Sequence, residues 1–215
     1  MNNCIVNLVT HKYIIGQDRL RKSLLDVSFN GDFLSFIGEQ SVGSPSHQQN
    51  PYAFKVYAIK KALELGYKKI FWLDASVYAV KDITPVFDCL QQKGIFMEDS
   101  GHSAATWSND NSLNYFGITR EEALNIPMYS SGISGFDFEN EISVKHFTMW
   151  EKSMKDGVFI GSWDNHRHDQ TAGTLIAHKL NITNLYSNCG DFGAYIGDCY
   201  STPKDSAVFH LKGLV

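Results

Sequence analysis

One aspartate directly follows a short apolar run. Residues Ile70-Phe71-Trp72-Leu73 lead into Asp74-Ala75-Ser76. The run predicts a central strand of an α/β sheet, and ligands of such sheets bind outside the carboxyl ends of the strands. Asp74 is therefore a candidate ligand-binding carboxylate by position alone, although an aspartate that only caps the next turn would give the same pattern.

A second group of chemically capable side chains lies between two predicted helices. Residues 163–170 read Trp-Asp-Asn-His-Arg-His-Asp-Gln, and Asp169 with Gln170 begins the second of these helices. One interpretation is a hydrolase in which His166, His168 and Asp169 hold a Zn²⁺ ion that activates water. Such a site needs further ligands, for which His102 or His210 would have to serve.

The elements that must position these side chains alternate between strand and helix. An apolar, β-branched run predicts a strand at 4–10, and the following residues 11–29 predict an amphipathic helix. The polar stretch 38–51 predicts a loop. Apolar residues on one face predict a helix at 52–65, with Gly66 as its C-terminal cap.

The rest of the chain continues the alternation. Thr119 and Glu122 match a capping box, which predicts a helix that ends before Pro127. Two glycines in the strand-like stretch 129–138 permit close backbone approach. Residues 99–115 form a polar region that also carries aromatic side chains. Further strands are predicted at 94–98 and 207–215, and further helices at 82–90, 144–155 and 169–180.

Length and charge limit the classes of protein. The chain has 215 residues, enough for one sizeable core, and a formal net charge of -4, which argues against a general nucleic-acid binder. No apolar run approaches the roughly 20 residues that span a bilayer, and the start lacks a signal-peptide pattern, so we expect a cytoplasmic protein. The aromatic content of 13% leaves open a non-catalytic sugar-binding module.

Several of these features together resemble the GT-A family of nucleotide-sugar glycosyltransferases, over nearly the whole chain. In detail the chain is similar to the N-terminal glycosyltransferase domain of larger proteins from chlorella-infecting viruses. The resemblance implies one Rossmann-like α/β domain over residues 1–215, with a mostly parallel central sheet flanked by helices, in a host cytoplasm and with room for further domains after it. The features are the first strand (5–10), Asp74-Ala75-Ser76 after its strand, Ser131-Gly132-Ile133, Asp169-Gln170 at a helix start, and His210-Leu211-Lys212-Gly213.

The resemblance also implies a donor and a metal. The expected reaction moves a hexose or deoxyhexose from a UDP-sugar to a glycan or glycoprotein acceptor, with Mn²⁺ or Mg²⁺ as cofactor. The implied metal ligands are Asp74, Ser76 and His210, where Ser76 replaces the second acid of the family's Asp-x-Asp motif. The implied donor-binding residues are Thr10, Tyr13, Lys55, Asp74, Ala75, Ser76, Ser131, Gly132, Lys212 and Gly213.

The stereochemical outcome depends on the residues near the sugar. In an inverting enzyme Asp169 would accept the proton of the acceptor. In a retaining enzyme the leaving phosphate oxygen would accept that proton, while Asp169 or Gln170 stabilises the positive charge on the sugar ring. Asp191 is a further carboxylate for acceptor contact. Asp-Gln at a helix start together with the late His-x-Lys-Gly resembles retaining members, so we expect retention.

Overall fold

A five-stranded sheet forms the centre of the molecule. The computed structural model describes residues 3–183, 195–196 and 208–211. The sheet has the order β2-β1-β3-β6-β5. β1 is parallel to β2 and β3, whereas β6 is antiparallel to β3 and β5, so four of the five strands share one direction, as expected. The strands are β1 (Asn3–Val9), β2 (Asp32–Ile37), β3 (Lys69–Leu73), β5 (Ile95–Ser103) and β6 (Pro127–Asp137).

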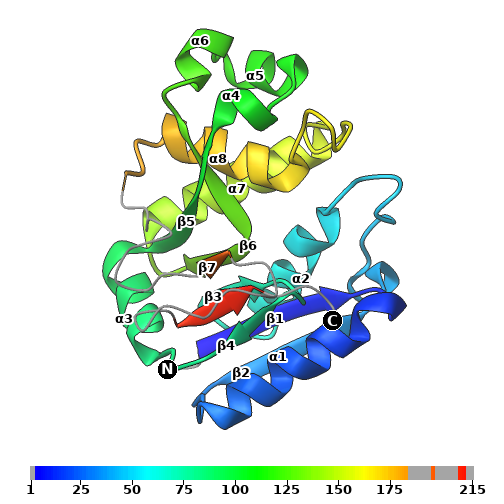
Figure 1. Cartoon of the computed structure of the whole chain (residues 1–215), viewed down its shortest axis with the longest axis vertical. Coiled ribbons are helices and arrows are strands. Elements are labelled where there is room, and N and C mark those ends of the chain that lie inside the picture. Colours follow the sequence, from blue (N-terminus) through cyan, green and yellow to red (C-terminus); the bar gives the residue numbers. More distant parts are fainter. Residues whose placement is uncertain (1–2, 184–194, 197–207, 212–215) are drawn as a thin grey trace.

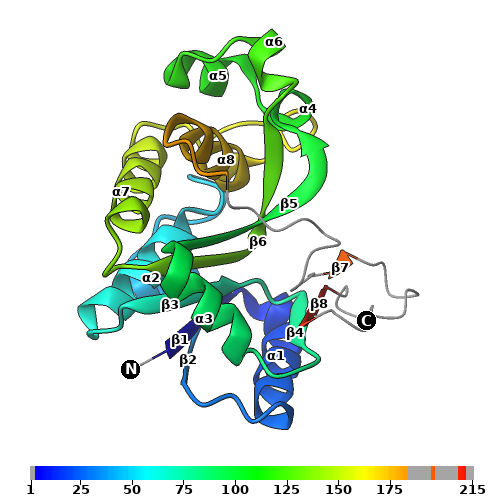
Figure 2. The same ribbon diagram turned by 90° about the vertical axis from the view of Figure 1, so that its left-hand side faces the viewer.

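Helices cover both faces of this sheet (Figure 1, Figure 2). A second, three-stranded sheet has the order β4-β8-β7 and consists of β4 (Val77–Ala79), β7 (Tyr195–Ile196) and β8 (Phe209–Leu211). The α-helices are α1 (Ile14–Asp26), α2 (Ala53–Glu64), α3 (Thr84–Lys93), α4 (Ala104–Trp107), α5 (Asp110–Phe116), α6 (Arg120–Ala123), α7 (Glu141–Lys155) and α8 (His168–Lys179). Short 3-10 helices span His11–Tyr13 and Glu39–Val42.

The alternation of side chains along the strands produces two cores. In β3, Ile70 and Trp72 join the core beneath α2, α7 and α8, whereas Phe71 and Leu73 join the core beneath α1 and α3. Neighbouring residues of a strand point to opposite faces, so a strand buried on both faces needs an unbroken apolar sequence. The run of apolar residues before Asp74 is therefore explained by the burial of β3 on both of its faces.

Most predicted elements are confirmed within a few residues. The predicted helix at 52–65 is α2, and Gly66 after it has a φ of 96°, a backbone conformation that favours glycine. The capping box is present, since the Thr119 side chain accepts from the Glu122 N–H and the Glu122 carboxylate accepts from the Thr119 N–H. Among the described residues, no helix is both long and apolar enough to cross a membrane.

Some elements differ from the prediction or were not predicted. The first helix ends at Asp26 instead of reaching residue 29, and the unpredicted strand β2 follows it. β2 lies at the edge of the sheet and is only partly buried, so its sequence lacks the apolar alternation of an ordinary strand. The polar, aromatic-bearing stretch 99–115, for which no element was predicted, contains the end of β5, α4 and most of α5. The Asn109 side chain accepts from the Ser112 N–H and caps α5.

Candidate functional site

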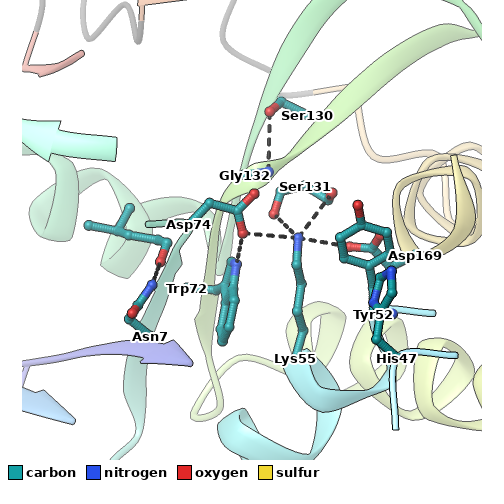
Figure 3. Close-up of polar contacts among 11 residues, drawn as sticks. Asn7, His47, Tyr52, Lys55, Trp72, Asp74, Ser130, Ser131, Gly132 and Asp169 are labelled. Atoms are coloured by element: carbon teal, nitrogen blue, oxygen red, sulfur yellow. Dashed lines mark hydrogen bonds and ion pairs between the residues drawn. The ribbon is translucent and has the colours of Figure 1, made fainter. Parts of the chain in front are cut away.

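A buried lysine joins two carboxylates from distant parts of the chain (Figure 3). The Lys55 ammonium of α2 lies 3.2 Å from Asp74 Oδ1 and 3.0 Å from Asp169 Oδ2. It also donates to the Ser131 carbonyl at 2.9 Å and to the Ser131 hydroxyl at 3.2 Å. The side chains of Lys55 and Asp169 are 1% and 2% exposed, whereas that of Asp74 is 34% exposed. Asp74 is thus the carboxylate that faces solvent.

Asp74 is held by groups of β3 and of the neighbouring strand β6. The Trp72 indole N–H donates to Asp74 Oδ1 at 2.7 Å, and the Asp74 backbone N–H donates to the Gly132 carbonyl of β6 at 2.9 Å. A Cβ atom on Gly132 would lie 3.3 Å from Asp74 Oδ2, closer than an ordinary contact. The glycine that the sequence suggested for close approach therefore makes room for the Asp74 carboxylate.

The turn after Asp74 is fixed by α1. Gly16 lies so close that a Cβ atom there would be 2.3 Å from the Ala75 carbonyl oxygen. Arg19 donates from Nη2 to the carbonyl oxygens of Ala75 and Ser76, at 3.3 and 3.2 Å. The sequence gives no signal for this contact, because nothing local in it pairs Arg19 with Ala75.

Asp169 is the second residue of α8, where the N-terminal end of the helix dipole favours a negative charge. His168 before it has a φ of 46°, which is uncommon for a residue other than glycine. The His168 ring hydrogen-bonds through Nδ1 to the Phe159 carbonyl at 2.8 Å. The Trp150 indole N–H donates to the Asp169 carbonyl at 3.0 Å. These contacts aim the Asp169 carboxylate toward Lys55.

Burial and charge act against each other in this group. Burial alone would lower the pKa of Lys55, but the adjacent Asp169 and Asp74 outweigh it and raise that pKa above its ordinary value. Burial raises the pKa of Asp169, and Lys55 offsets part of that rise. With Lys55 protonated and both carboxylates ionised, the three side chains carry one net negative charge.

A cavity of about 430 Å³ opens beside Asp74. Its walls bring together several sequence-predicted residues, and they add His47 and Tyr52, which sequence reasoning missed. His47 lies in a polar loop that carries no functional signal, and Tyr52 was read only as a helix start. The Tyr52 backbone N–H donates to His47 Nδ1 at 3.3 Å, and burial raises the pKa of Tyr52 to about 12. The lining residues are Leu8, Val9, Thr10, Lys12, Tyr13, His47, Tyr52, Phe54, Trp72, Asp74, Ala75 and Ser76.

Other predicted site residues within the described part of the chain do not line this cavity. Gln170 borders a separate space of only about 10 Å³, together with Ser131 and Asp169. His210 is buried in β8 opposite Tyr78 of β4, and the Tyr78 hydroxyl shares a hydrogen bond with its Nδ1. A metal would therefore have to bind His210 through Nε2. Asp191, Lys212 and Gly213 lie outside the described residues.

The two histidines of the hydrolase interpretation are both held by backbone carbonyls. His166 Nε2 bonds to the Val158 carbonyl at 2.9 Å, and His168 Nδ1 bonds to that of Phe159. Within residues 3–183, 195–196 and 208–211, no group of three His, Cys, Asp or Glu side chains is arranged to hold a metal ion. The described part of the chain gives the zinc-hydrolase interpretation no support.

Comparison with known proteins finds structural but not sequence similarity. No family model matches the chain, and no curated protein matches it. The bifunctional glycosyltransferase WbbM is similar with a TM-score of 0.52 at 10% identity, over 86% of this chain and 38% of its own. A glycosyltransferase involved in the glycosylation of the major capsid of PBCV-1, a chlorella virus, is similar with a TM-score of 0.52 at 13% identity, over 97% of this chain and 92% of its own. The chain therefore has the GT-A fold that the sequence suggested.

Proposed function

We propose that this GT-A-fold chain is a glycosyltransferase that moves a hexose or deoxyhexose from a UDP-sugar to a glycan or glycoprotein acceptor, with Mn²⁺ or Mg²⁺ and with retention of configuration. One observation carries the proposal. A solvent-facing carboxylate, Asp74, stands at the carboxyl end of a central strand beside a cavity of about 430 Å³, and buried Lys55 ties it to Asp169. Ligands of α/β sheets bind at this edge.

The cavity suits the nucleoside part of the donor. Its volume falls within the range of small-molecule sites, and its walls combine aromatic rings with a few polar groups. Thr10 and Tyr13 follow the end of β1, where they can contact the base and ribose. Asp74 and Ser76 at the end of β3 would then face the diphosphate. The preference for uridine comes from the family resemblance alone.

The residues fit a divalent cation if the substrate completes its coordination. Asp74 lines the cavity and is one-third exposed, which suits Mg²⁺ or Mn²⁺ bound by one carboxylate and by phosphate oxygens. We propose that Asp74, the Ser76 hydroxyl and His210 Nε2 hold the ion, and an imidazole ligand would favour Mn²⁺. When bound, such an ion stabilises the charge on the departing diphosphate.

In the proposed reaction the bond between the anomeric carbon and the phosphate oxygen breaks, and a bond to the acceptor oxygen forms on the same face of the sugar. The acceptor proton passes to the departing phosphate oxygen. Asp169 is ion-paired with Lys55, and together with Asp74 it leaves this group one net negative charge, which would stabilise the positive charge that develops on the sugar ring. Lys55 keeps the two carboxylates at a fixed separation. Gln170 and Asp191 keep their proposed roles near the sugar and the acceptor, and Lys212 and Gly213 theirs at the diphosphate.

The test is hydrolysis of a panel of nucleotide-sugars in the absence of acceptor, with Mn²⁺, Mg²⁺ or chelator. We expect one UDP-sugar to be hydrolysed with metal, and Asp74→Asn to lower that rate by about a hundredfold or more. Asp88→Asn, an exposed aspartate on α3, is the matched control and should keep the rate. The anomeric configuration of a transfer product, read by NMR, then decides between retention and inversion.

Two results would contradict the proposal. The chain could hydrolyse no nucleotide-sugar under any metal condition, or Asp74→Asn could hydrolyse the donor as fast as the unmodified chain. Sugar binding that survives Asp74→Asn, without any donor turnover, would favour a non-catalytic sugar-binding module instead.

A further inference from the structure

An exposed tryptophan stands on the loop between α7 and α8, drawn in yellow in Figure 1. Trp163 is 54% exposed, although it contacts the rings of Tyr52 and His168 and the guanidinium of Arg167. Its ring lies 5.7 Å from the His168 ring at an interplanar angle of 24°, and 6.1 Å from the Tyr52 ring. The Arg167 guanidinium lies 4.1 Å from its ring centre. An indole with this much exposed surface is a candidate contact for a ligand.

The indole is held in place before any ligand arrives. Arg167 also lies 3.6 Å from the centre of the Trp107 ring, so one guanidinium contacts both indoles. Arg167 Nη1 donates to the Trp163 carbonyl and ties the loop to the start of α8. His168 is fixed in turn by its bond to Phe159. A ring fixed in this way loses little conformational entropy when a ligand stacks on it.

Trp163 lies next to the candidate active site. Its neighbour Tyr52 lines the cavity of about 430 Å³ that also contains Asp74. Its other neighbour, His168, directly precedes Asp169. Contacts between aromatic rings thus connect the proposed donor cavity with the exposed indole. A second sugar bound there would lie beside the one that is transferred.

Polar residues flank Trp163 in the loop. Ser162, Asp164 and Asn165 are all exposed, and the Ser162 hydroxyl donates to Asp164 Oδ2 at 3.1 Å. A pyranose ring presents an apolar face of C–H groups, whose weak positive charge is attracted to the negative face of an aromatic ring, and hydroxyls around its edge. An exposed indole flanked by polar residues matches that chemistry.

We infer that Trp163 is a stacking platform for a sugar ring of the glycan acceptor. The inference rests on the proposed function, because it assigns the acceptor to a surface beside the proposed donor site. It adds a specificity-determining residue outside the donor-binding motifs.

Saturation-transfer NMR with methyl glycosides and short oligosaccharides tests the platform without any turnover. We expect at least one glycoside to receive saturation at the C–H groups of one ring face, and Trp163→Ala to weaken its binding by about tenfold. Trp163→Phe should recover part of the affinity. Ile160→Ala, an equally exposed apolar residue of the same loop, is the matched control and should bind like the unmodified chain. Each variant should have the same unfolding midpoint as the unmodified chain, which excludes a folding defect as the cause of weaker binding.

Binding of no glycoside by the unmodified chain overturns the inference, and so does a Trp163→Ala variant that binds as well as the unmodified chain. Glycoside binding that depends on Trp163, found in a chain that hydrolyses no nucleotide-sugar, supports the platform while the proposed transferase function fails. In an active enzyme, the platform predicts that Trp163→Ala raises the KM for acceptor far more than the KM for donor.

Discussion

Replacing Lys55 by methionine tests whether the buried ammonium compensates two carboxylates. The substitution keeps an unbranched side chain only one atom shorter, but it leaves Asp169, at 2% exposure, without its cation 3.0 Å away. Asp169 can avoid a buried, uncompensated charge by binding a proton. An ordinary aspartate has a pKa of about 3.9, so keeping the carboxyl protonated takes a free energy of about 4 kcal/mol at pH 7 and about 1.5 kcal/mol at pH 5. Loss of one partner from a buried ion pair costs a similar amount, about 3–5 kcal/mol.

The pH dependence has a definite sign. A carboxyl whose pKa is raised in the folded state contributes stability that is complete below its ordinary pKa and is lost as the pH rises through the raised value. Burial already raises the pKa of Asp169, and removal of Lys55 raises it further. The deficit of Lys55→Met should therefore be about 4 kcal/mol at pH 7 and clearly smaller at pH 5.

Urea unfolding, followed by tryptophan fluorescence at both pH values, measures the deficit. Lys60→Met is the matched control on the same helix, since Lys60 is 42% exposed and its ion pair with Glu151 should contribute under about 1 kcal/mol. In the double variant Lys55→Met/Asp169→Asn we expect recovery of about 2 kcal/mol or more and no difference between the two pH values. A single-variant deficit below about 1 kcal/mol at pH 7, or one of equal size at pH 5, would refute the reasoning.

Two further predictions concern packing and acid stability. Gly16→Ala should lower the free energy of unfolding, measured in urea, by about 1–3 kcal/mol, because its Cβ would lie 2.3 Å from the Ala75 carbonyl oxygen. Gly173→Ala is the control and should not lower the free energy of unfolding, because its Cβ would make only ordinary contacts. Equal losses of stability in the two variants would contradict the prediction. His146 and His166 each bond to a carbonyl through Nε2, have no described partner at Nδ1, and have pKa values that burial lowers to about 4. The neutral form of each histidine is favoured in the folded state, so its contribution to the free energy of unfolding is complete above pH 6.5 and is lost as the pH falls toward 4. For His146 this loss amounts to about 3 kcal/mol. His146→Gln should lose less stability between pH 7 and 4.5, and an unchanged acid loss would count against the assignment.

Local patterns were enough to predict much of the fold. The capping box at Thr119 was readable because a helix start is set by contacts three residues apart. The unbroken apolar run of β3 was readable because burial on both faces demands it. Asp74 could be chosen as a candidate site residue because the end of such a strand has a known relation to ligand sites. β2 was missed because an edge strand needs no such pattern.

What the sequence by itself determined is an alternation of strands and helices, with a carboxylate directly after the apolar run of a central strand. The tertiary structure alone decided which groups meet there. Lys55 and Asp169 are far apart in the chain, and their 3.0 Å contact depends on how α2 and α8 pack on the sheet. The placement of Tyr52 and Trp163 beside that pair has the same origin. Neighbours in sequence fix helices and strands through local hydrogen bonds and periodicity, whereas packing between elements brings together side chains that no local pattern connects.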